Sequence, residues 1–585
     1  MMSKFYVFIF ISILISILPQ VASQEFSLWS EEVDALIELD ERELVIEDYD
    51  KAKLKVHRII HVYNEKGDKH GHVKLWEDEF RKCKKLGGSL LSIDGDVLKE
   101  IDDDDISKSQ LSPGYALYND TQYQWIDLKW NQYPYKIEYE YELDYETLFY
   151  WPDWYPQKDI PVLKSTYRLI IEKEHIDYRT YFIGMEVTPK IIKDGKTREM
   201  LWELSNISPK IEEDFMPPEN EIQMALKFEP IRFTMNSYIA KFDSWDGVAR
   251  WYSELAKERY ELPPQFKTTV HQIVSDASSE YEKISRLFSF LQKNTRYVAI
   301  HLGIGGWQPH SAEAVSKNKY GDCKDLSTLM IAMLQEAGID AYPALTLTRD
   351  KGVIIKDFPS QDFNHLITFV PLQEDTLWLE CTSNLVEAGE LPSSVEGCDV
   401  LVVNQSEAEI IRTPQSRASN NLWQSHVNAR LTSAGLLFMK GKINLDGNQG
   451  LHARANLAYR KSEQKKNWLR NLLGRNMPQL DLERFETHNV RQDYVKPVTL
   501  EFEGKVSNFA ISSARRLFLN PNILNQISRN SIPKEEERHF PIYRNYPYLD
   551  IDSVEIELPL GFSLEAVPPD QDIQTSFGTY KTDYV

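Results

Sequence analysis

The chain has 585 residues, of which 42% are hydrophobic and 12% aromatic, so it can bury large hydrophobic cores and does not have the composition of a disordered protein. Its formal net charge of −22 argues against nucleic acid or an anionic membrane as the main partner, because both require a basic surface. The chain is longer than one hydrophobic core usually organises, which predicts about three domains.

The N-terminus has the pattern of a signal peptide. Lys4 precedes the apolar stretch 5–18, and the small residues of VASQ come directly after it. This stretch is shorter than the ~20 residues that span a bilayer, so we expect cleavage after Ser23, giving a signal peptide over residues 1–23, rather than a permanent anchor. The protein is then exported to the periplasm, the cell envelope or the medium, with no transmembrane span in the mature chain.

The cysteines and the acidic run give little sign of disulfide bonds or metal sites. Four cysteines in 585 residues are too few for a disulfide framework, although Cys83 and Cys398 could pair. No CxxC or Cys/His cluster indicates zinc. The acidic run 102–105 lacks the glycine and the spaced ligands of a calcium loop. We therefore expect no metal and no cofactor.

From residue 24 to 235, polar and apolar residues alternate in short runs such as KAKLKVHRIIHVYN and YKIEYEYELDY. Period-two alternation rich in Tyr, Ile and Val is typical of half-buried antiparallel strands. This segment is predicted to be a β-sandwich-like domain.

Between residues 240 and 400 the spacing of apolar residues becomes helical. One amphipathic helix is predicted to begin at the cap Ser275 and to run through SDASSEYEKISRLFSFLQKN. A second is predicted to begin near Cys323 and to stop at Gly338. Strand patterns come next in YPALTLT, LITFVP and TLWLEC, so this segment is predicted to be an α+β domain.

From residue 415 to 585 the alternating patterns return, which predicts a C-terminal β-rich domain. Strands are predicted in RLTSAGLLFMKGKINL, LHARANLAYR, VTLEFEGKV and DSVEIELPL. One helix is predicted in SEQKKNWLRNLLGRN.

The stretch GDCKDLS, residues 321–327, contains a candidate nucleophile. A thiolate attacks acyl carbons, and a free cysteine is only slightly ionised at neutral pH. Gly321 permits a tight turn and Asp322 is a good N-cap, so Cys323 is expected in the first helical turn. There the macrodipole is equivalent to about half a positive charge and favours the anion. The alternative is that Cys323 is a small, inert residue at a helix start.

Two polar residues bound the next pair of strand patterns: His365 opens the first and Glu380 ends the second. Their connection, LQEDT, is short enough for a hairpin. If Leu372 faces Asp375, His365 opposes Thr382 and Glu380 is its diagonal neighbour, with Cα atoms ~7–8 Å apart. Glu380 can then accept a hydrogen bond from one imidazole nitrogen and direct the other to a thiol. The alternatives are a structural histidine and a solvated glutamate.

A resemblance to the transglutaminase-like core of the papain-like cysteine superfamily extends over about residues 265–400. It is carried by NTRYVAIHLGIGGWQPHSAEAVSKNKYGDCKDLSTLMIAMLQEAGIDAYPALTLT, FNHLITFVP and LWLECTS. The flanks, with KPVTLEFEGKV and RRLFLNPNIL, resemble a bacterial arrangement of N- and C-terminal β domains of unknown function. The implied fold class is multidomain, with an α+β transglutaminase-like core between two mainly antiparallel, sandwich-like β domains.

The resemblance implies that Cys323 is the nucleophile, His365 the general base and then acid, and Glu380 the orienting carboxylate. At the last position the superfamily more usually has Asp. The oxyanion is expected to be held by the backbone N–H of Cys323 and one upstream donor, for which Trp307 and Gln308 are candidates. The alternative for these two residues is a wall of the cleft.

The implied activity is acyl transfer through a cysteine thioester, with hydrolysis of a peptide or amide bond expected rather than transfer to an amine. A protein, peptide or other amide-containing component of the cell envelope is the expected substrate. The competing hypothesis, from another class of function, is a catalytically inactive transglutaminase-like scaffold in a protein that binds a protein or glycan.

Overall fold

The computed structural model describes residues 33–110, 116–119, 121–301, 303–373, 375–404, 407–474, 477–491, 496–525 and 537–585. The chain divides into two compact units. The first holds most of the chain up to residue 413, and the second holds most of the residues from 414 to the C-terminus. The predicted signal peptide, residues 1–23, lies outside the described residues. Among the described residues, no helix is long and apolar enough to cross a membrane.

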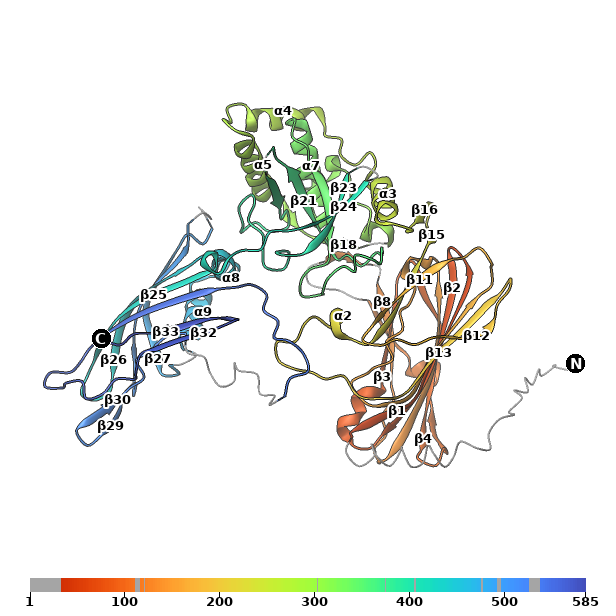
Figure 1. Ribbon diagram of the computed structural model, residues 1–585, viewed down its shortest axis with the longest axis horizontal. Coiled ribbons are helices and arrows are strands. Elements are labelled where there is room, and N and C mark those ends of the chain that lie inside the picture. The colour runs from red at the N-terminus through yellow and green to blue at the C-terminus, as the bar shows by residue number, and fades with distance from the viewer. Residues whose placement is uncertain are drawn as a thin grey trace, which may run out of the picture. The chain divides into compact units, whose positions relative to one another are not determined.

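An eight-stranded sheet dominates the N-terminal part of the first unit (Figure 1). Its strands, in spatial order, are β12 (Lys190–Lys193), β13 (Arg198–Ile207), β10 (Val162–Ile171), β1 (Ala35–Asp48), β2 (Lys51–Val62), β9 (Tyr135–Tyr145), β4 (Arg81–Ser92) and β5 (Val97–Glu100). Strands β1 and β10 are parallel, and the other neighbours are antiparallel. Along β9, Tyr135, Ile137 and Tyr139 are buried and alternate with half-buried residues, as the period-two pattern predicts.

Smaller strand groups surround this sheet. They are the three-stranded group of β3 (His72–Glu77), β8 (Gln122–Asp127) and β6 (Ser107–Gln110), the pair of β11 (Tyr178–Ile183) and β14 (Ala225–Pro230), and the pair of β15 (Arg232–Met235) and β16 (Tyr238–Lys241). The short strand β7 (Ala116–Asn119) pairs in parallel with β18 (Ala299–His301).

The α+β part of the first unit consists of helices and a five-stranded antiparallel sheet. The helices are α3 (Trp245–Ala256), α4 (Pro264–Val274), α5 (Glu280–Asn294), α6 (Ala312–Asn318) and α7 (Cys323–Glu336). The sheet has the order β22 (Thr376–Leu379), β21 (His365–Pro371), β20 (Tyr342–Thr346), β23 (Asp399–Asn404) and β24 (Glu407–Arg412). Helices α4, α5 and α7 pack together, and α7 lies on β20 and β21 (Figure 1).

The predicted helix around residues 275–294 is confirmed, but its start is not at Ser275. The side chain of Ser279 accepts a hydrogen bond from the backbone N–H of Glu282 at 3.1 Å and caps α5. Ser275 instead comes directly after the last residue of α4. The apolar stripe of α5 is buried as predicted, and it consists of Ile284, Leu287, Phe288 and Leu291.

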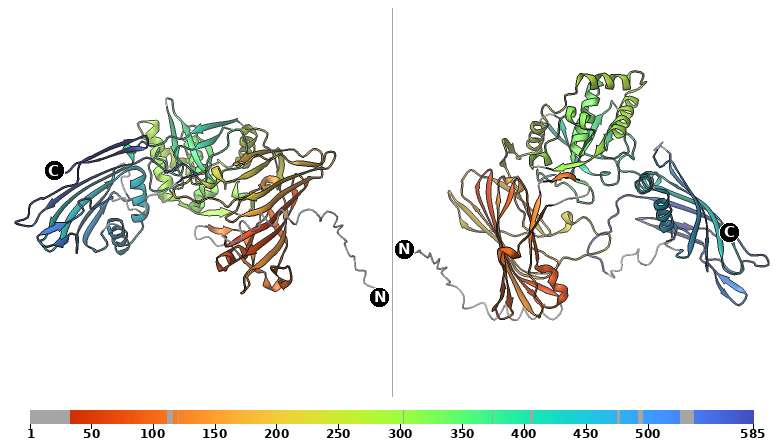
Figure 2. Two further views of the ribbon diagram at one scale, coloured as in Figure 1. Left: turned by 60° about the horizontal axis from the view of Figure 1, so that its bottom comes forward. Right: turned by 180° about the vertical axis from the view of Figure 1, so that it is seen from behind.

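The second unit holds a five-stranded sheet with helices α8 (Gly447–Leu457) and α9 (Ser462–Gly474) on one face (Figure 2). The sheet order is β27 (Leu480–His488), β28 (Val498–Val506), β26 (Leu437–Leu445), β25 (Leu422–Leu431) and β31 (Leu549–Glu557). Two hairpins accompany it, β29 (Ile511–Ser513) with β30 (Arg516–Phe518) and β32 (Gln571–Thr575) with β33 (Gly578–Thr582).

The prediction of a strand in LHARANLAYR was wrong, because these residues belong mostly to α8. Asp446 caps the helix by accepting from the backbone N–H of Gly447 at 2.9 Å. Ala453 and Leu457, one helical turn apart, are buried against the core of this unit. The helix predicted in SEQKKNWLRNLLGRN is confirmed as α9, which buries Leu469 and Leu473.

The fold is multidomain and strand-rich, with an α+β segment between two β-rich segments along the sequence, as expected. The domain boundaries 24–235, 240–400 and 415–585 stay predictions. All four cysteines, Cys323 and Cys381 as well as Cys83 and Cys398, are free thiols, so the pairing considered for the last two is not formed.

Candidate active site

Cys323 is the first residue of α7, and a capping box fixes the turn before it. The Asp322 side chain accepts from the backbone N–H of Asp325, and the Asp325 side chain accepts from the backbone N–H of Asp322, both at 3.3 Å. A Cβ atom on Gly321 would lie 2.4 Å from the Cβ of Asp325. Glycine is therefore required at 321, because Asp325, the second member of the capping box, packs against it. The prediction of Cys323 in the first turn of a capped helix is confirmed.

The hairpin of β21 and β22 has the register predicted from its short connection. Thr368 faces Leu379 and Phe369 faces Trp378, while the backbone N–H of Leu372 donates to the carbonyl of Asp375 at 2.9 Å. This register places Glu380, the residue after β22, beside the start of β21.

His365 and Glu380 are in direct contact, with 2.7 Å between the imidazole Nε2 and the carboxylate Oε2. The other carboxylate oxygen accepts from the backbone N–H of Thr382 at 2.9 Å and from its hydroxyl at 2.5 Å. The side chain of Glu380 is 3% exposed and that of His365 15%, so water competes little with these bonds. The extra methylene of Glu relative to Asp thus does not prevent the contact.

Electrostatics favour a charged pair. Burial opposes the charge on His365, but the carboxylate of Glu380 and the neighbouring Cys323 side chain raise its pKa well above the usual range. Burial also opposes the charge on Glu380, but the imidazole of His365 and the two donors of Thr382 lower its pKa. The imidazolium and the carboxylate therefore stabilise each other next to Cys323.

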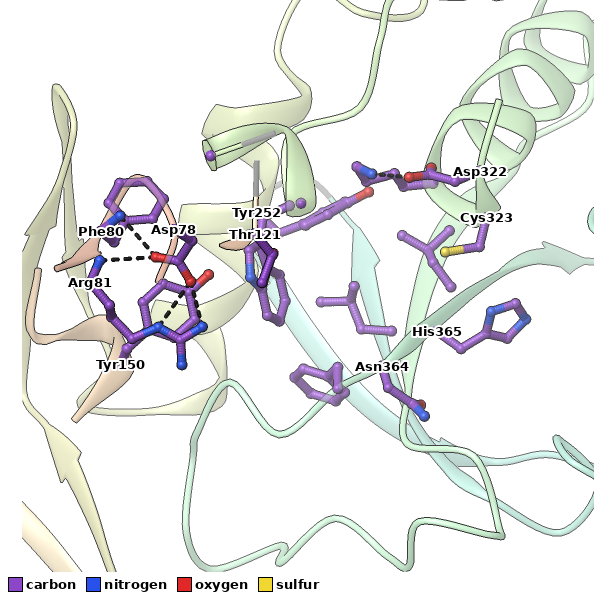
Figure 3. Close-up of a pocket in the computed structure, with 17 residues that line it drawn as sticks. Asp78, Phe80, Arg81, Thr121, Tyr150, Tyr252, Asp322, Cys323, Asn364 and His365 are labelled. Atoms are coloured by element: carbon purple, nitrogen blue, oxygen red, sulfur yellow. Dashed lines mark hydrogen bonds and ion pairs between the residues drawn. The ribbon is translucent and has the colours of Figure 1, made fainter. Parts of the chain in front are cut away.

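A cavity of about 400 Å³ opens onto Cys323 and His365. The N-terminal part of the unit supplies its other end through Asp78, Phe80, Arg81 and Tyr150 (Figure 3).

This wall is organised by Asp78, which accepts from the backbone N–H groups of Phe80 and Arg81, each at 2.9 Å. The Arg81 guanidinium also donates to Asp78 and lies 5.1 Å from the centre of the Tyr150 ring. The predicted core alone thus does not enclose the cavity.

The two oxyanion candidates differ in whether they line the cavity. Trp307 lines the cavity, and its ring packs 5.1 Å from that of Phe149. Gln308 does not line it, and its side-chain amide donates to the Tyr238 hydroxyl at 2.8 Å. The backbone N–H groups of both candidates donate to the Ile304 carbonyl at 2.8 Å. The backbone N–H groups of both candidates are thus engaged elsewhere, and their part in oxyanion binding stays a prediction.

Charged residues behind Cys323 are paired with one another. Lys324 is buried and forms an ion pair with Asp322. The imidazole Nδ1 of His310 lies 3.1 Å from a carboxylate oxygen of Asp325. Both pairs hold the first turn of α7 in place.

One group of side chains in the described part of the chain has the composition of a metal site: Glu486, His488 and Glu501, all exposed. Their ligand atoms lie within 4.8 Å of one another on β27 and β28, in the second unit. Glu501 already pairs with Lys442 at 3.6 Å and Glu486 with Arg484 at 3.9 Å. None of these residues lines the cavity at Cys323.

Sequence reasoning missed several residues of the site. Thr382 was placed opposite His365, but its role as the anchor of Glu380 was missed and could have been found from its place two residues after the carboxylate. Tyr252 of α3 and the wall at Asp78 come from segments with no motif, so only the fold brings them to the cavity.

Comparison with known proteins identifies the middle segment. Residues 267–383 match the transglutaminase-like superfamily. Residues 50–211 and 515–585 match two domains of unknown function, DUF3857 and DUF3858. The chain therefore carries a transglutaminase-like core flanked by these two domains, as the resemblance implied.

Among solved structures, a "putative protease" from Parabacteroides distasonis is 13% identical, with a TM-score of 0.53, over 81% of this chain and 93% of that one. The two proteins share a fold. A "putative cysteine protease" from Cytophaga hutchinsonii is 10% identical, with a TM-score of 0.17, over 57% of this chain and 76% of that one. No curated protein sequence matches the chain.

Proposed function

We propose that the protein is a cysteine hydrolase that cleaves a peptide or amide bond through a thioester on Cys323. The observation that carries this proposal is the 2.7 Å contact between the imidazole of His365 and the Glu380 carboxylate, in the cavity that Cys323 and His365 line together. A nucleophile, a base and an orienting acid are the groups that acyl transfer requires.

In the first half-reaction, the Cys323 thiolate attacks the substrate carbonyl carbon and the carbonyl electron pair moves onto oxygen. The tetrahedral intermediate collapses, the C–N bond breaks, and the imidazolium of His365 gives its proton to the leaving amine. Glu380 keeps the ring oriented and stabilises its charge throughout.

In the second half-reaction, His365 removes a proton from a water molecule as that water attacks the thioester. Collapse of the second intermediate breaks the C–S bond, releases the carboxylic acid product and returns the thiolate. An amine in place of water would give transfer instead of hydrolysis. The fold shared with a protein described as a putative protease supports water as the acceptor.

The test is to offer fluorescein-labelled casein with and without dansylcadaverine to the full chain and to Cys323→Ala. New fragments that depend on Cys323 are the expected result. Dansyl incorporation without fragments would replace hydrolysis by transfer. If neither occurs and a panel of amide substrates also remains intact, the inactive scaffold becomes the better hypothesis.

We also propose that the protein is exported, on the strength of the charged, apolar and small-residue pattern over residues 1–23. Expression of the full gene product in a bacterial host and N-terminal sequencing of the secreted or periplasmic form test this. A mature chain that begins at Gln24 is expected, and an uncleaved cytoplasmic product would contradict it.

A further inference from the structure

Tyr252 is a buried donor in the cavity that the triad does not use. It belongs to α3, outside the stretch that matches the transglutaminase-like superfamily, and it is 1% exposed. It lines the same cavity as Cys323 and His365. In Figure 3 its hydroxyl points toward the end of the cavity where Cys323 lies.

The Tyr252 hydroxyl has no hydrogen-bond partner within the described ranges. The residue is almost wholly buried, but its hydroxyl oxygen is not among the atoms that are shielded from solvent without a partner, so the hydroxyl opens onto the cavity that Tyr252 lines. A donor that is left free beside a nucleophile is thus available to a ligand oxygen.

The helix that carries Tyr252 is held firmly. The neighbouring Trp251 is buried, with its ring 5.2 Å from that of Phe149 and 5.5 Å from that of Trp307. Ser244 caps the helix by accepting from the backbone N–H of Gly247 at 3.2 Å. The position of the hydroxyl is therefore fixed before substrate binds, which is what electrostatic stabilisation of a transition state requires.

The backbone N–H of Cys323 is a second donor at the same cavity. The backbone N–H of Cys323 lies in the first turn of α7, where helix geometry provides no acceptor, and it has none among the described residues. The upstream candidates Trp307 and Gln308 instead donate their backbone N–H groups to Ile304.

We propose that the Tyr252 hydroxyl, together with the backbone N–H of Cys323, donates a hydrogen bond to the oxyanion of both tetrahedral intermediates. This inference rests on the proposed acyl transfer and names a catalytic residue for it. The hydroxyl keeps its proton and transfers none. Burial and the neighbouring charges, those of Tyr260, Cys323 and Asp322 foremost, raise the pKa of Tyr252 well above its usual value, so the donor stays neutral.

The experiment compares two reactions of the same thiol in Tyr252→Phe. Acylation by p-nitrophenyl acetate passes through an oxyanion, whereas alkylation by iodoacetamide does not. We expect the acylation rate to fall about 10²–10³-fold, the range found for removing one oxyanion donor. We expect the alkylation rate at Cys323 to change less than about twofold. Since the hydroxyl has no partner among the residues that the structure describes, the substitution removes no hydrogen bond seen there.

Tyr260→Phe is the matched control, because Tyr260 lies just after α3 but does not line the cavity. Unchanged acylation in Tyr252→Phe would overturn the inference. An equal fall of acylation and alkylation would also overturn it, because Tyr252 would then act on the thiol rather than on the oxyanion. Failure of the proposed function looks different: the wild type would then show no acylation beyond that of Cys323→Ala.

Discussion

Glu380 reaches His365 across the β21 and β22 hairpin, with 2.7 Å between carboxylate and imidazole, although it is a diagonal and not a direct partner in the register. The longer side chain of Glu spans this diagonal. The backbone N–H and the hydroxyl of Thr382 donate to the carboxylate oxygen that does not contact His365. The carboxylate position in this chain is thus matched to a Glu.

Shortening or neutralising Glu380 is expected to impair catalysis. Glu380→Gln should lower kcat/KM about 10²–10⁴-fold, because the ring loses both its orientation and its counter-charge. Glu380→Asp should lower it about tenfold or more, because one methylene less no longer reaches Nε2. The rate of amide hydrolysis by each variant measures both effects on kcat/KM. Full activity in Glu380→Asp would show that the length of the carboxylate side chain at this position does not matter.

Cys323 is expected to be alkylated selectively. Burial raises the pKa of Cys83 and Cys398 to about 11 and that of Cys381 to about 12, so these thiols carry little thiolate near neutral pH. Treatment with iodoacetamide at pH 7 and peptide mass mapping should show Cys323 modified at least about tenfold faster than the other three. Equal slow labelling at all four sites would contradict an activated thiol.

The charged pair is expected to stabilise the fold most at mildly acidic pH. The raised pKa of His365 contributes fully below its ordinary value of about 6.5 and is lost as pH rises through the folded value. The lowered pKa of Glu380 contributes above about 4.3 and is lost as pH falls through the folded value. The difference in Tm between wild type and Glu380→Gln should therefore be largest near pH 5–6. A difference that is constant from pH 4 to 10 would refute the pairing.

Gly321→Ala is expected to destabilise the first unit. The new Cβ would lie 2.4 Å from the Asp325 Cβ, which has to move and disturb the capping box. We expect a loss of about 1–3 kcal/mol in free energy of unfolding, measured by denaturant titration. Gly305→Ala is the control, because nothing lies within 4 Å of its added Cβ. Equal stability of the two variants would rule out the packing role of Gly321.

The wall from the N-terminal part is expected to affect binding more than chemistry. Tyr150→Ala removes a ring from the wall of the cavity and leaves the three proposed catalytic residues unchanged. KM should rise about 3–10-fold with kcat nearly unchanged, the pattern of lost uniform binding. Trp76→Ala, which removes a 40% exposed ring outside the cavity, should leave both constants unchanged. A loss of kcat alone in Tyr150→Ala would argue against a binding role.

Much of the site could be predicted because it depends on local rules. Capping by Asp322 and the register of a short hairpin are decided within a few residues, so the positions of Cys323, His365 and Glu380 could be inferred from the sequence. Tyr252 could not be predicted, because its approach to Cys323 results from the packing of α3 and no short spacing encodes it.

The misplaced elements have equally specific causes. In LHARANLAYR the apolar residues alternate with polar ones, but Ala453 and Leu457 also have helical spacing, and the cap at Asp446 precedes the stretch. Around α5, both Ser275 and Ser279 can cap, but only Ser279 has a Glu three residues later, as in a capping box. Attention to caps would have corrected both predictions.

The wall formed by Phe80, Arg81 and Tyr150 matters for inhibitor design. Proteins that share only the transglutaminase-like core would present the same candidate thiol to an inhibitor. They would lack these aromatic and cationic surfaces. A thiol-reactive compound extended toward this wall should gain selectivity there, and screening against a fragment that begins near residue 240 would miss it.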